Sequence, residues 1–207
     1  ETVVFPARPP FEADLNRKPG KLAAGAQYKR FALTADHVSP RAIPGEKGNM
    51  HVVTGLEHNE LGRPNDSAEM HEAMSRKRHE KLKAALRHPD FTHYKRFGDE
   101  GPVDVGLISW GSTFGECLEA MIKARGEGIR CAAMKVVMLS PFPTHGVTAF
   151  MADCKEVLVP ELNYQGQFAN LLQANVARTV TRLNRVSGEP MKVEEILEEI
   201  RRLAGKK

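Results

Sequence analysis

The chain has 207 residues, and its shares of hydrophobic residues (41%) and charged residues (27%) are ordinary for a globular protein of one or two domains. No uninterrupted apolar run approaches the roughly 20 residues that a membrane-spanning helix needs. The opening residues lack the basic and apolar regions of a signal peptide, so we expect neither membrane insertion nor secretion.

The net charge of +4 is unevenly distributed, since residues 1–98 carry 17 Lys and Arg against 12 Asp and Glu. A basic surface attracts nucleic acid, but here no nucleic-acid-binding motif accompanies it and aromatic residues are not interleaved with the basic ones. Cys117, Cys131 and Cys154 lack the CxxC spacing of zinc and iron–sulfur sites. We therefore expect reduced, mostly buried thiols in a cytoplasmic protein without a nucleic-acid partner.

Residues 1–50 predict an extended arm, because prolines and glycines interrupt the segment throughout and each proline biases the preceding residue away from helix. Such a segment cannot by itself bury enough apolar surface to offset its ordering entropy, so we expect it to lie against another part of an assembly. Residues 66–87 then predict a helix capped by Ser67. Its basic run SRKRHEKLK is typical of a solvated face. A linker through Gly98 and Gly101 follows.

From about residue 102 the pattern alternates between strands and helices. We expect strands at residues 103–110, 131–139, 156–159 and 180–186. We expect helices at residues 113–125, 145–152, 166–176 and 193–203. Strands that alternate with helices of this length imply mainly parallel pairing, with helices on both faces of the sheet. The sequence therefore predicts a three-layer α/β/α domain.

The helix at residues 113–125 has the clearest local signals. Thr113 and Glu116 form the pattern of a capping box, in which the two side chains bond free backbone N–H groups of the first turn. The apolar residues repeat at helical spacing and predict one buried face. That face comprises Phe114, Cys117, Leu118, Met121 and Ile122.

Ligands of open α/β sheets usually bind beyond the carboxyl ends of the strands. The candidates at such ends are Ser112, Thr113, Glu161, Asn163 and Gln167. The first loop is neither GxGxxG nor a Walker loop, and a simple strand-to-helix turn explains it equally well. Glu161 has no carboxylate or histidine partner nearby in sequence for acid–base work. The segment GLEHNE lacks the HExxH spacing of a zinc site. We predict no catalytic residue and no metal site.

Residues 51–82, HVVTGLEHNELGRPNDSAEMHEAMSRKRHEKL, resemble alpha subunits of 2-oxoacid:ferredoxin oxidoreductases, especially the 2-oxoglutarate type. The matching residues are Thr54, Gly55, Glu57, His58, Glu60 and Gly62, then Lys77, Arg78, Lys81 and Leu82. Downstream, VGLISWGST and VPELNYQGQFANLL are similar to the transketolase C-terminal-like domain of that family. The resemblance covers about residues 30–175.

The resemblance implies an enzyme that decarboxylates a 2-oxoacid on thiamine diphosphate, passes two electrons through a [4Fe–4S] cluster to ferredoxin, and forms an acyl-CoA from coenzyme A. The implied partners are a beta subunit that holds thiamine diphosphate, Mg²⁺ and the cluster, the remainder of the alpha subunit, a second alpha/beta pair, and ferredoxin. This chain departs from a full alpha subunit, because it has no YPITP-like motif and no gamma domain. We therefore expect this stretch alone to bind none of these cofactors and to be inactive.

The resemblance also implies a division of the chain. Residues 1–95 correspond to the tail of the pyrimidine-side domain, and residues 96–207 to the transketolase C-terminal-like domain. We expect a structural and assembly role, in which the six matching residues of the TGLEHNELG run order a loop or contact a partner. A solvated turn is the alternative for that run. Two further functions stay open: a domain of a pyruvate or indolepyruvate oxidoreductase, and a non-catalytic α/β interaction module that binds acidic partners.

Overall fold

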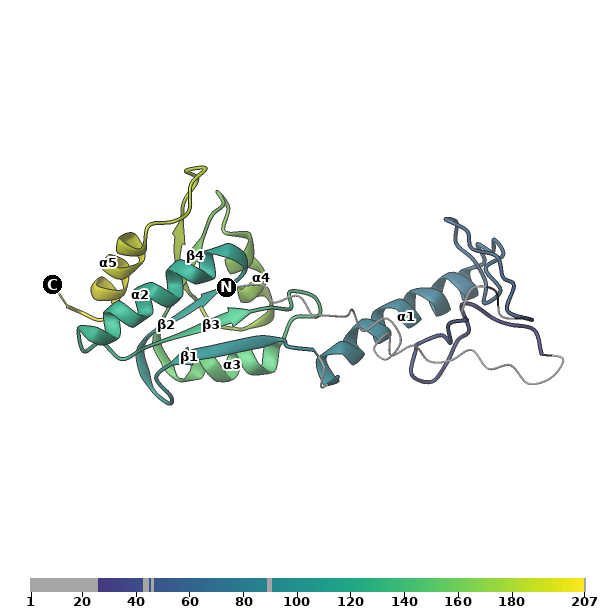
Figure 1. The fold of residues 1–207 in the computed structure, drawn as a ribbon, viewed down its shortest axis with the longest axis horizontal. Coiled ribbons are helices and arrows are strands. Elements are labelled where there is room, and N and C mark those ends of the chain that lie inside the picture. The colour runs from purple at the N-terminus through teal and green to yellow at the C-terminus, as the bar shows by residue number, and fades with distance from the viewer. Residues whose placement is uncertain (1–25, 43–44, 46, 89–90, 207) are drawn as a thin grey trace. The chain divides into compact units, whose positions relative to one another are not determined.

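The computed structural model describes residues 26–42, 45, 47–88 and 91–206 (Figure 1). Much of the expected arm, residues 1–25, lies outside the described residues. The chain divides into two compact units, Glu1–Ala84 and Ala85–Lys207, termed the first and second units. None of the helices formed by the described residues is long and apolar enough to cross a membrane.

Among the described residues of the first unit, Ala68–Ala84 form helix α1. The Ser67 Oγ accepts a hydrogen bond from the N–H of Met70 at 3.3 Å, so the expected cap at its start is confirmed. The buried residues of α1 are Met74 and Lys77. Leu82, which continues the apolar stripe in the sequence, is 49% exposed.

The second unit begins with a short 3₁₀ turn, η1 (Ala85–Arg87), and contains the expected alternation of strands and helices. Its strands are β1 (Tyr94–Gly98), β2 (Val103–Ser109), β3 (Cys131–Val136), β4 (Cys154–Glu161) and β5 (Thr181–Asn184). Its helices are α2 (Phe114–Gly126), α3 (Thr144–Ala152), α4 (Gln167–Asn175) and α5 (Val193–Leu203). A 3₁₀ turn, η2 (Gly111–Thr113), joins β2 to α2.

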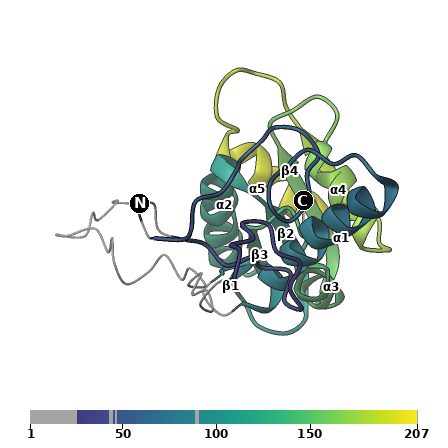
Figure 2. The ribbon, with the colours of Figure 1, turned by 90° about the vertical axis from the view of Figure 1, so that its right-hand side faces the viewer.

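The five strands form one sheet in the order β1-β3-β2-β4-β5. β2 pairs in parallel with both β3 and β4, and β5 pairs in parallel with β4. Helices α2 and α5 pack on one face of the sheet, and α3 and α4 pack on the other (Figures 1 and 2). The three-layer α/β/α fold is therefore confirmed.

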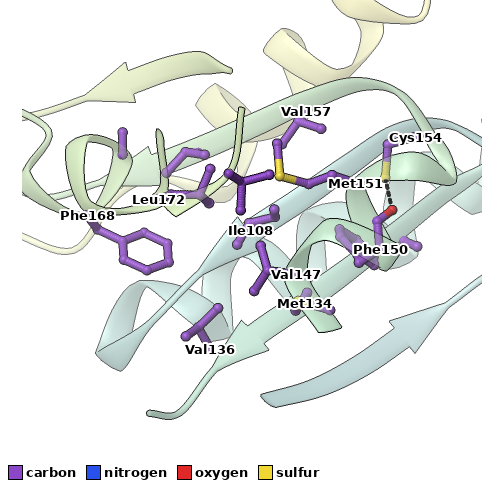
Figure 3. Close-up of a cluster of buried hydrophobic side chains, with 14 of the residues drawn as sticks. Ile108, Met134, Val136, Val147, Phe150, Met151, Cys154, Val157, Phe168 and Leu172 are labelled. Atoms are coloured by element: carbon purple, nitrogen blue, oxygen red, sulfur yellow. Dashed lines mark hydrogen bonds between the residues drawn. The ribbon is translucent and has the colours of Figure 1, made fainter. Parts of the chain in front are cut away.

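The apolar core of the second unit has one layer on each side of the sheet. On one face, Phe150 and Met151 of α3 lie with Leu172 of α4 over Ile108 and Met134 of the sheet (Figure 3). On the other face, α2 and α5 cover the opposite side chains of β2, β3 and β4. The two faces alternate along each strand because successive side chains point to opposite sides.

Strand β1 corrects the expected linker through Gly98. It pairs antiparallel with β3, with Tyr94 opposite Val136 and Gly98 opposite Ala132. The strand lies at the sheet edge and its side chains are exposed or half-buried. The charged pair Lys95 and Arg96 removes the apolar alternation by which a strand is recognised in sequence, as is common at sheet edges.

Two expectations about α2 are wrong. Thr113 does not form a capping box, because η2 places it in the helical region (φ −61°, ψ −13°) and its side chain makes no cap hydrogen bond. A capping residue needs extended backbone. Ile122 is 56% exposed, since the buried face of α2 is completed by Ala120 and Ala124 instead. Phe114, which begins the face, is buried as expected.

Candidate functional site

The GLEHNE loop, residues 55–60, is tied to α1 through Glu57. Its carboxylate accepts a hydrogen bond from Arg78 (Nη2 to Oε1, 3.0 Å) and contacts His71 (Nδ1 to Oε2, 2.8 Å). Its main-chain carbonyl accepts the N–H of Asn65 at 2.9 Å. The hydrogen bonds from Arg78, chiefly, and from His71 lower the pKa of Glu57 to about 2.

Acidification is expected to weaken this attachment. The pKa of Glu57 is about 2 in the folded chain against an ordinary 4.5, so its stabilising effect is complete above pH 4.5 and is lost as the pH falls toward 2. NMR titration of the Glu57 carboxyl carbon should give a midpoint near 2, with the Arg78 side-chain signals moving in step. Replacing Arg78 by glutamine should raise that midpoint. A midpoint at 4.5 in the parent chain would contradict the ion pairs.

Glu60 fixes the same loop to the segment before it. Its Oε1 accepts the N–H of Leu33 at 2.9 Å and its Oε2 contacts Lys29 Nζ at 2.9 Å. Burial alone would raise the pKa of Glu60, but the Leu33 N–H and the Lys29 ammonium lower it, and the net shift is downward. His58 is 8% exposed, and the centre of its ring lies 4.0 Å from the centre of the Phe31 ring. The loop therefore joins residues 29–33 to α1.

The remaining residues of the motif shape the loop. The Thr54 Oγ1 accepts the N–H of Leu56 at 3.2 Å. Gly55 is exposed, with no atom within 4 Å of the position that a Cβ would occupy. Gly62 is buried at φ +80°, and a Cβ there would lie 2.0 Å from the carbonyl oxygen of Val52. These residues surround one ordered loop, and their contacts are compatible with the expected loop-ordering role.

Lys77 departs from the expectation that the basic run is a solvated face. Its side chain is 8% exposed, and its Nζ donates to the carbonyl oxygen of Phe31 at 2.7 Å and to the hydroxyl of Ser39. Burial chiefly, and then the charges of Lys81 and Arg30, lower the pKa of Lys77 to about 8. Its place three residues after the buried Met74, on the same helix face, was the available signal.

At the carboxyl end of β4, Glu161 and Asn163 cap helix α4. Glu161 is 3% exposed, and its carboxylate accepts the N–H groups of Phe168 (2.8 Å) and Ala169 (3.3 Å) and the side-chain amide of Asn163. The Asn163 Oδ1 accepts the N–H of Gln167 at 3.1 Å. A carboxylate is favourable at a helix N-terminus, where backbone N–H groups are free. Three of the strand-end candidates therefore meet in one structural cap.

Replacing Glu161 by alanine is expected to lower the free energy of unfolding of the second unit by about 2 kcal/mol, because it leaves buried N–H groups without an acceptor. Urea denaturation followed by circular dichroism measures the loss. Glu161→Gln, which keeps one carbonyl acceptor, should cost less. Glu198→Ala, at an exposed position of α5, should stay within about 0.5 kcal/mol of the parent. Equal stability of Glu161→Ala and Glu198→Ala would refute the cap.

The other two strand-end candidates lie at the carboxyl end of β2. β2 leads to α2 on one face of the sheet, whereas the neighbouring β4 leads to α4 on the opposite face. This divergence is the topological switch point at which α/β proteins usually bind ligands. Thr113 is buried in η2, and Ser112 is exposed.

A cavity of about 370 Å³ opens at this switch point. It is lined by Ser112, Glu116, Leu162 and residues 185–190. Of the strand-end candidates only Ser112 lines it. Sequence reasoning missed Glu116, which was assigned to a cap, and Arg185, which follows β5. The parallel pairing of β5 with β4 brings Arg185 to this edge, and that pairing was the available signal.

Among the described residues, no group of three or more His, Cys, Asp and Glu side chains is placed to hold a metal ion. The three cysteines are buried and unpaired. Burial raises the pKa of Cys117 and of Cys131 to about 12, and that of Cys154 to about 11. These thiols are therefore protonated near neutral pH.

Comparison with known proteins shows which families the chain resembles. A family model for the pyruvate:ferredoxin oxidoreductase core domain II matches residues 103–196. The chain is 34% identical over 180 residues to the alpha subunit of 2-oxoacid:ferredoxin oxidoreductase 2 from Aeropyrum pernix, covering 86% of this chain and 28% of the relative. It is 33% identical over 174 residues to the 2-oxoglutarate oxidoreductase subunit KorA from Mycobacterium tuberculosis, covering 83% and 26%.

A solved structure extends the likeness to three dimensions. The 2-oxoglutarate:ferredoxin oxidoreductase from Magnetococcus marinus, with 2-oxoglutarate, coenzyme A and succinyl-CoA bound, matches with a TM-score of 0.83 and 39% identity over 91% of this chain and 32% of that chain. The chain belongs to the alpha-subunit family of 2-oxoacid:ferredoxin oxidoreductases. It spans less than a third of the length of these relatives. The family named from the TGLEHNELG run is confirmed.

Proposed function

We propose that the chain is the C-terminal stretch of the alpha subunit of a thiamine diphosphate-dependent 2-oxoacid:ferredoxin oxidoreductase. The whole enzyme would convert a 2-oxoacid, coenzyme A and oxidised ferredoxin into acyl-CoA, CO₂ and reduced ferredoxin. The observation that carries the proposal is the match to the Magnetococcus marinus enzyme over 91% of the chain at 39% identity. Its bound 2-oxoglutarate and the KorA relative favour 2-oxoglutarate as the substrate.

Within that enzyme, the proposed role of this stretch is structural. The polar strand-end residues that could take part in acid–base chemistry, such as Glu161, are used to cap α4. Glu57 and Glu60 are engaged in ordering the GLEHNE loop. With these groups committed to hydrogen bonds within the chain, the stretch is suited to support and join subunits, and the proposal assigns it no catalytic residue.

In the part of the chain that the structure describes, no group of three or more His, Cys, Asp and Glu side chains is placed to hold a metal ion. The three cysteines of this sequence are fewer than the four that hold a [4Fe–4S] cluster. We therefore assign thiamine diphosphate, Mg²⁺ and the cluster to a beta subunit, and coenzyme A to the assembled enzyme. The proposed partners are that beta subunit, the remainder of the alpha subunit, a second alpha/beta pair and ferredoxin. The proposed location is the cytoplasm, without membrane or nucleic acid.

The test is isolation of the protein from its host through an affinity tag at its C-terminus. The expected product is a brown complex that contains a beta subunit, with visible absorbance from an iron–sulfur cluster. With coenzyme A it should reduce ferredoxin when 2-oxoglutarate is added. A colourless, monodisperse product without a beta subunit would contradict the enzyme proposal and favour the interaction module.

The substrate panel decides between the two enzyme proposals. The family model that matches residues 103–196 is described for pyruvate:ferredoxin oxidoreductase, which keeps pyruvate as the second candidate. Turnover should be compared at equal concentrations of 2-oxoglutarate, pyruvate and indolepyruvate. A higher kcat/KM for pyruvate or indolepyruvate would replace 2-oxoglutarate as the substrate and leave the family unchanged.

A further inference from the structure

The carboxyl edge of the sheet in the second unit carries exposed apolar side chains. The apolar edge is defined as Trp110, Leu162, Tyr164 and Val186, which are 41%, 37%, 86% and 72% exposed. They follow β2, β4 and β5, which are parallel neighbours and therefore end at the same edge. Figures 1 and 2 show the loops after β4 and β5 rising side by side.

These side chains do not serve the core, because the two faces of the sheet are already filled by buried residues of its strands and helices. The ring centre of Trp110 lies 6.3 Å from that of Phe168 in the first turn of α4. Large apolar side chains that gather on one exposed surface usually mark a contact site, and Trp and Tyr are enriched in protein interfaces. The apolar edge therefore has the composition of an interface.

The cavity at the switch point opens within this edge, since Leu162 and Val186 belong to both. Its volume of about 370 Å³ is at the small end of ligand pockets and suits a single inserted side chain. Its walls are mostly apolar and include Pro190. A pocket of this kind at the centre of an apolar patch is where interfaces place an anchoring residue.

The charged side chains that line the cavity are Glu116, Arg185 and Glu189. The Glu116 Oε2 is buried and makes no hydrogen bond to any residue that the structure describes. A buried carboxylate oxygen without a donor is costly, so this atom calls for a donor from outside. Arg185 also lines the cavity, but its Nε contacts Glu195 Oε2 at 2.9 Å and its Nη1 donates to the Asn184 carbonyl at 3.0 Å. Its charge is therefore balanced by Glu195, whereas the Glu116 Oε2 has no partner among the residues that the structure describes.

We propose that the apolar edge docks a partner surface of the complex, and that this surface inserts one basic side chain, lysine or arginine, into the cavity to meet Glu116. The aliphatic stem of such a side chain would lie along Leu162 and Val186, and its charged head would donate to the Glu116 Oε2. This inference rests on the proposed function, because the assembly supplies the partner. Charge complementarity and the apolar walls together select a basic side chain over an acidic one.

The test compares matched variants in the complete complex. Val186→Asp places a charge in the docked surface and should weaken subunit association about thirtyfold, or about 2 kcal/mol. Ile122→Asp is the control, because Ile122 is an equally apolar side chain, 56% exposed on α2 and outside the edge. It should assemble like the parent. Association is measured by mass photometry over a dilution series.

A second pair tests the basic anchor. Glu116→Gln should weaken association about tenfold, whereas Glu119→Gln, three residues along α2 at an exposed position, should leave it unchanged. Equal assembly of Val186→Asp and Ile122→Asp overturns the docking proposal. A second outcome also overturns it. In that outcome, butylammonium raises the melting temperature of the parent but not of Glu116→Gln, and Glu116→Gln still assembles normally. The cavity would then bind a small amine and not a partner side chain.

The two proposals fail separately. Docking is judged from the mass of the complex, and the proposed function from ferredoxin reduction by the parent with a 2-oxoacid. If the parent complex assembles, its assembly is weakened by Val186→Asp, and it turns over no 2-oxoacid, the enzyme proposal is refuted and the docking proposal is supported. An active parent that tolerates both Val186→Asp and Glu116→Gln supports the enzyme and refutes the docking surface. A parent without any partner overturns both.

Discussion

Replacing Phe150 by alanine is expected to lower the free energy of unfolding of the second unit by about 4 kcal/mol. The side chain is 1% exposed and belongs to the core layer between α3 and the sheet (Figure 3). Its ring also lies 5.2 Å from the guanidinium carbon of Arg96, which is ion-paired with Asp153 at 2.6 Å. Alanine would remove the apolar contacts and leave a cavity beneath that ion pair.

Urea denaturation monitored by circular dichroism gives the change in free energy. The matched control is Phe91→Ala, since Phe91 is 51% exposed and so buries far less surface than Phe150. Its cost should be below about 1 kcal/mol. If the two substitutions destabilised the unit equally, the assignment of Phe150 to the core would be wrong.

The core of the second unit was predictable because its elements follow one simple rule. Apolar residues recur with a period near 3.6 in α2 and α5, and continuous apolar runs form the central strands β2 and β3. β1 was not predicted, because an edge strand with solvated charged side chains shows no periodic pattern of apolar residues. Thr113 was misassigned because the capping-box pattern records residue types and not backbone conformation, which η2 fixes.

The candidate sites were harder to predict, because they depend on contacts between distant segments. Glu57 contacts Arg78 of α1, and Glu60 contacts Lys29. Both contacts arise because the loop folds back on the chain, and no local residue spacing in the sequence encodes that fold. The cavity combines residues after three different strands with one from α2. Sequence could place the strand ends at one edge through the parallel topology. The sequence could not show that the Glu161 carboxylate caps α4, or that the Glu116 Oε2 lacks a hydrogen-bond donor among the described residues.

Gly62→Ala is expected to destabilise the closed loop of the first unit by about 2–3 kcal/mol. Gly62 has φ +80°, a conformation that costs an L-residue about 1–2 kcal/mol. An added Cβ would also lie 2.0 Å from the Val52 carbonyl oxygen and 3.0 Å from the Phe31 ring. The backbone must shift to relieve this clash, and the shift works against the contacts of residues 57–60.

Gly55→Ala is the matched control within the same motif, because its Cβ would meet nothing within 4 Å. Hydrogen exchange of the Phe31 and Leu33 amides, which donate to Glu60, reports loop opening. Exchange should accelerate by about 30- to 150-fold in Gly62→Ala, as a change of 2–3 kcal/mol requires, and stay near the parent rate in Gly55→Ala. If the loop orders an assembly contact, the same contrast should recur in the affinity between subunits. Faster exchange with unaltered affinity would assign the loop to stability of the first unit alone.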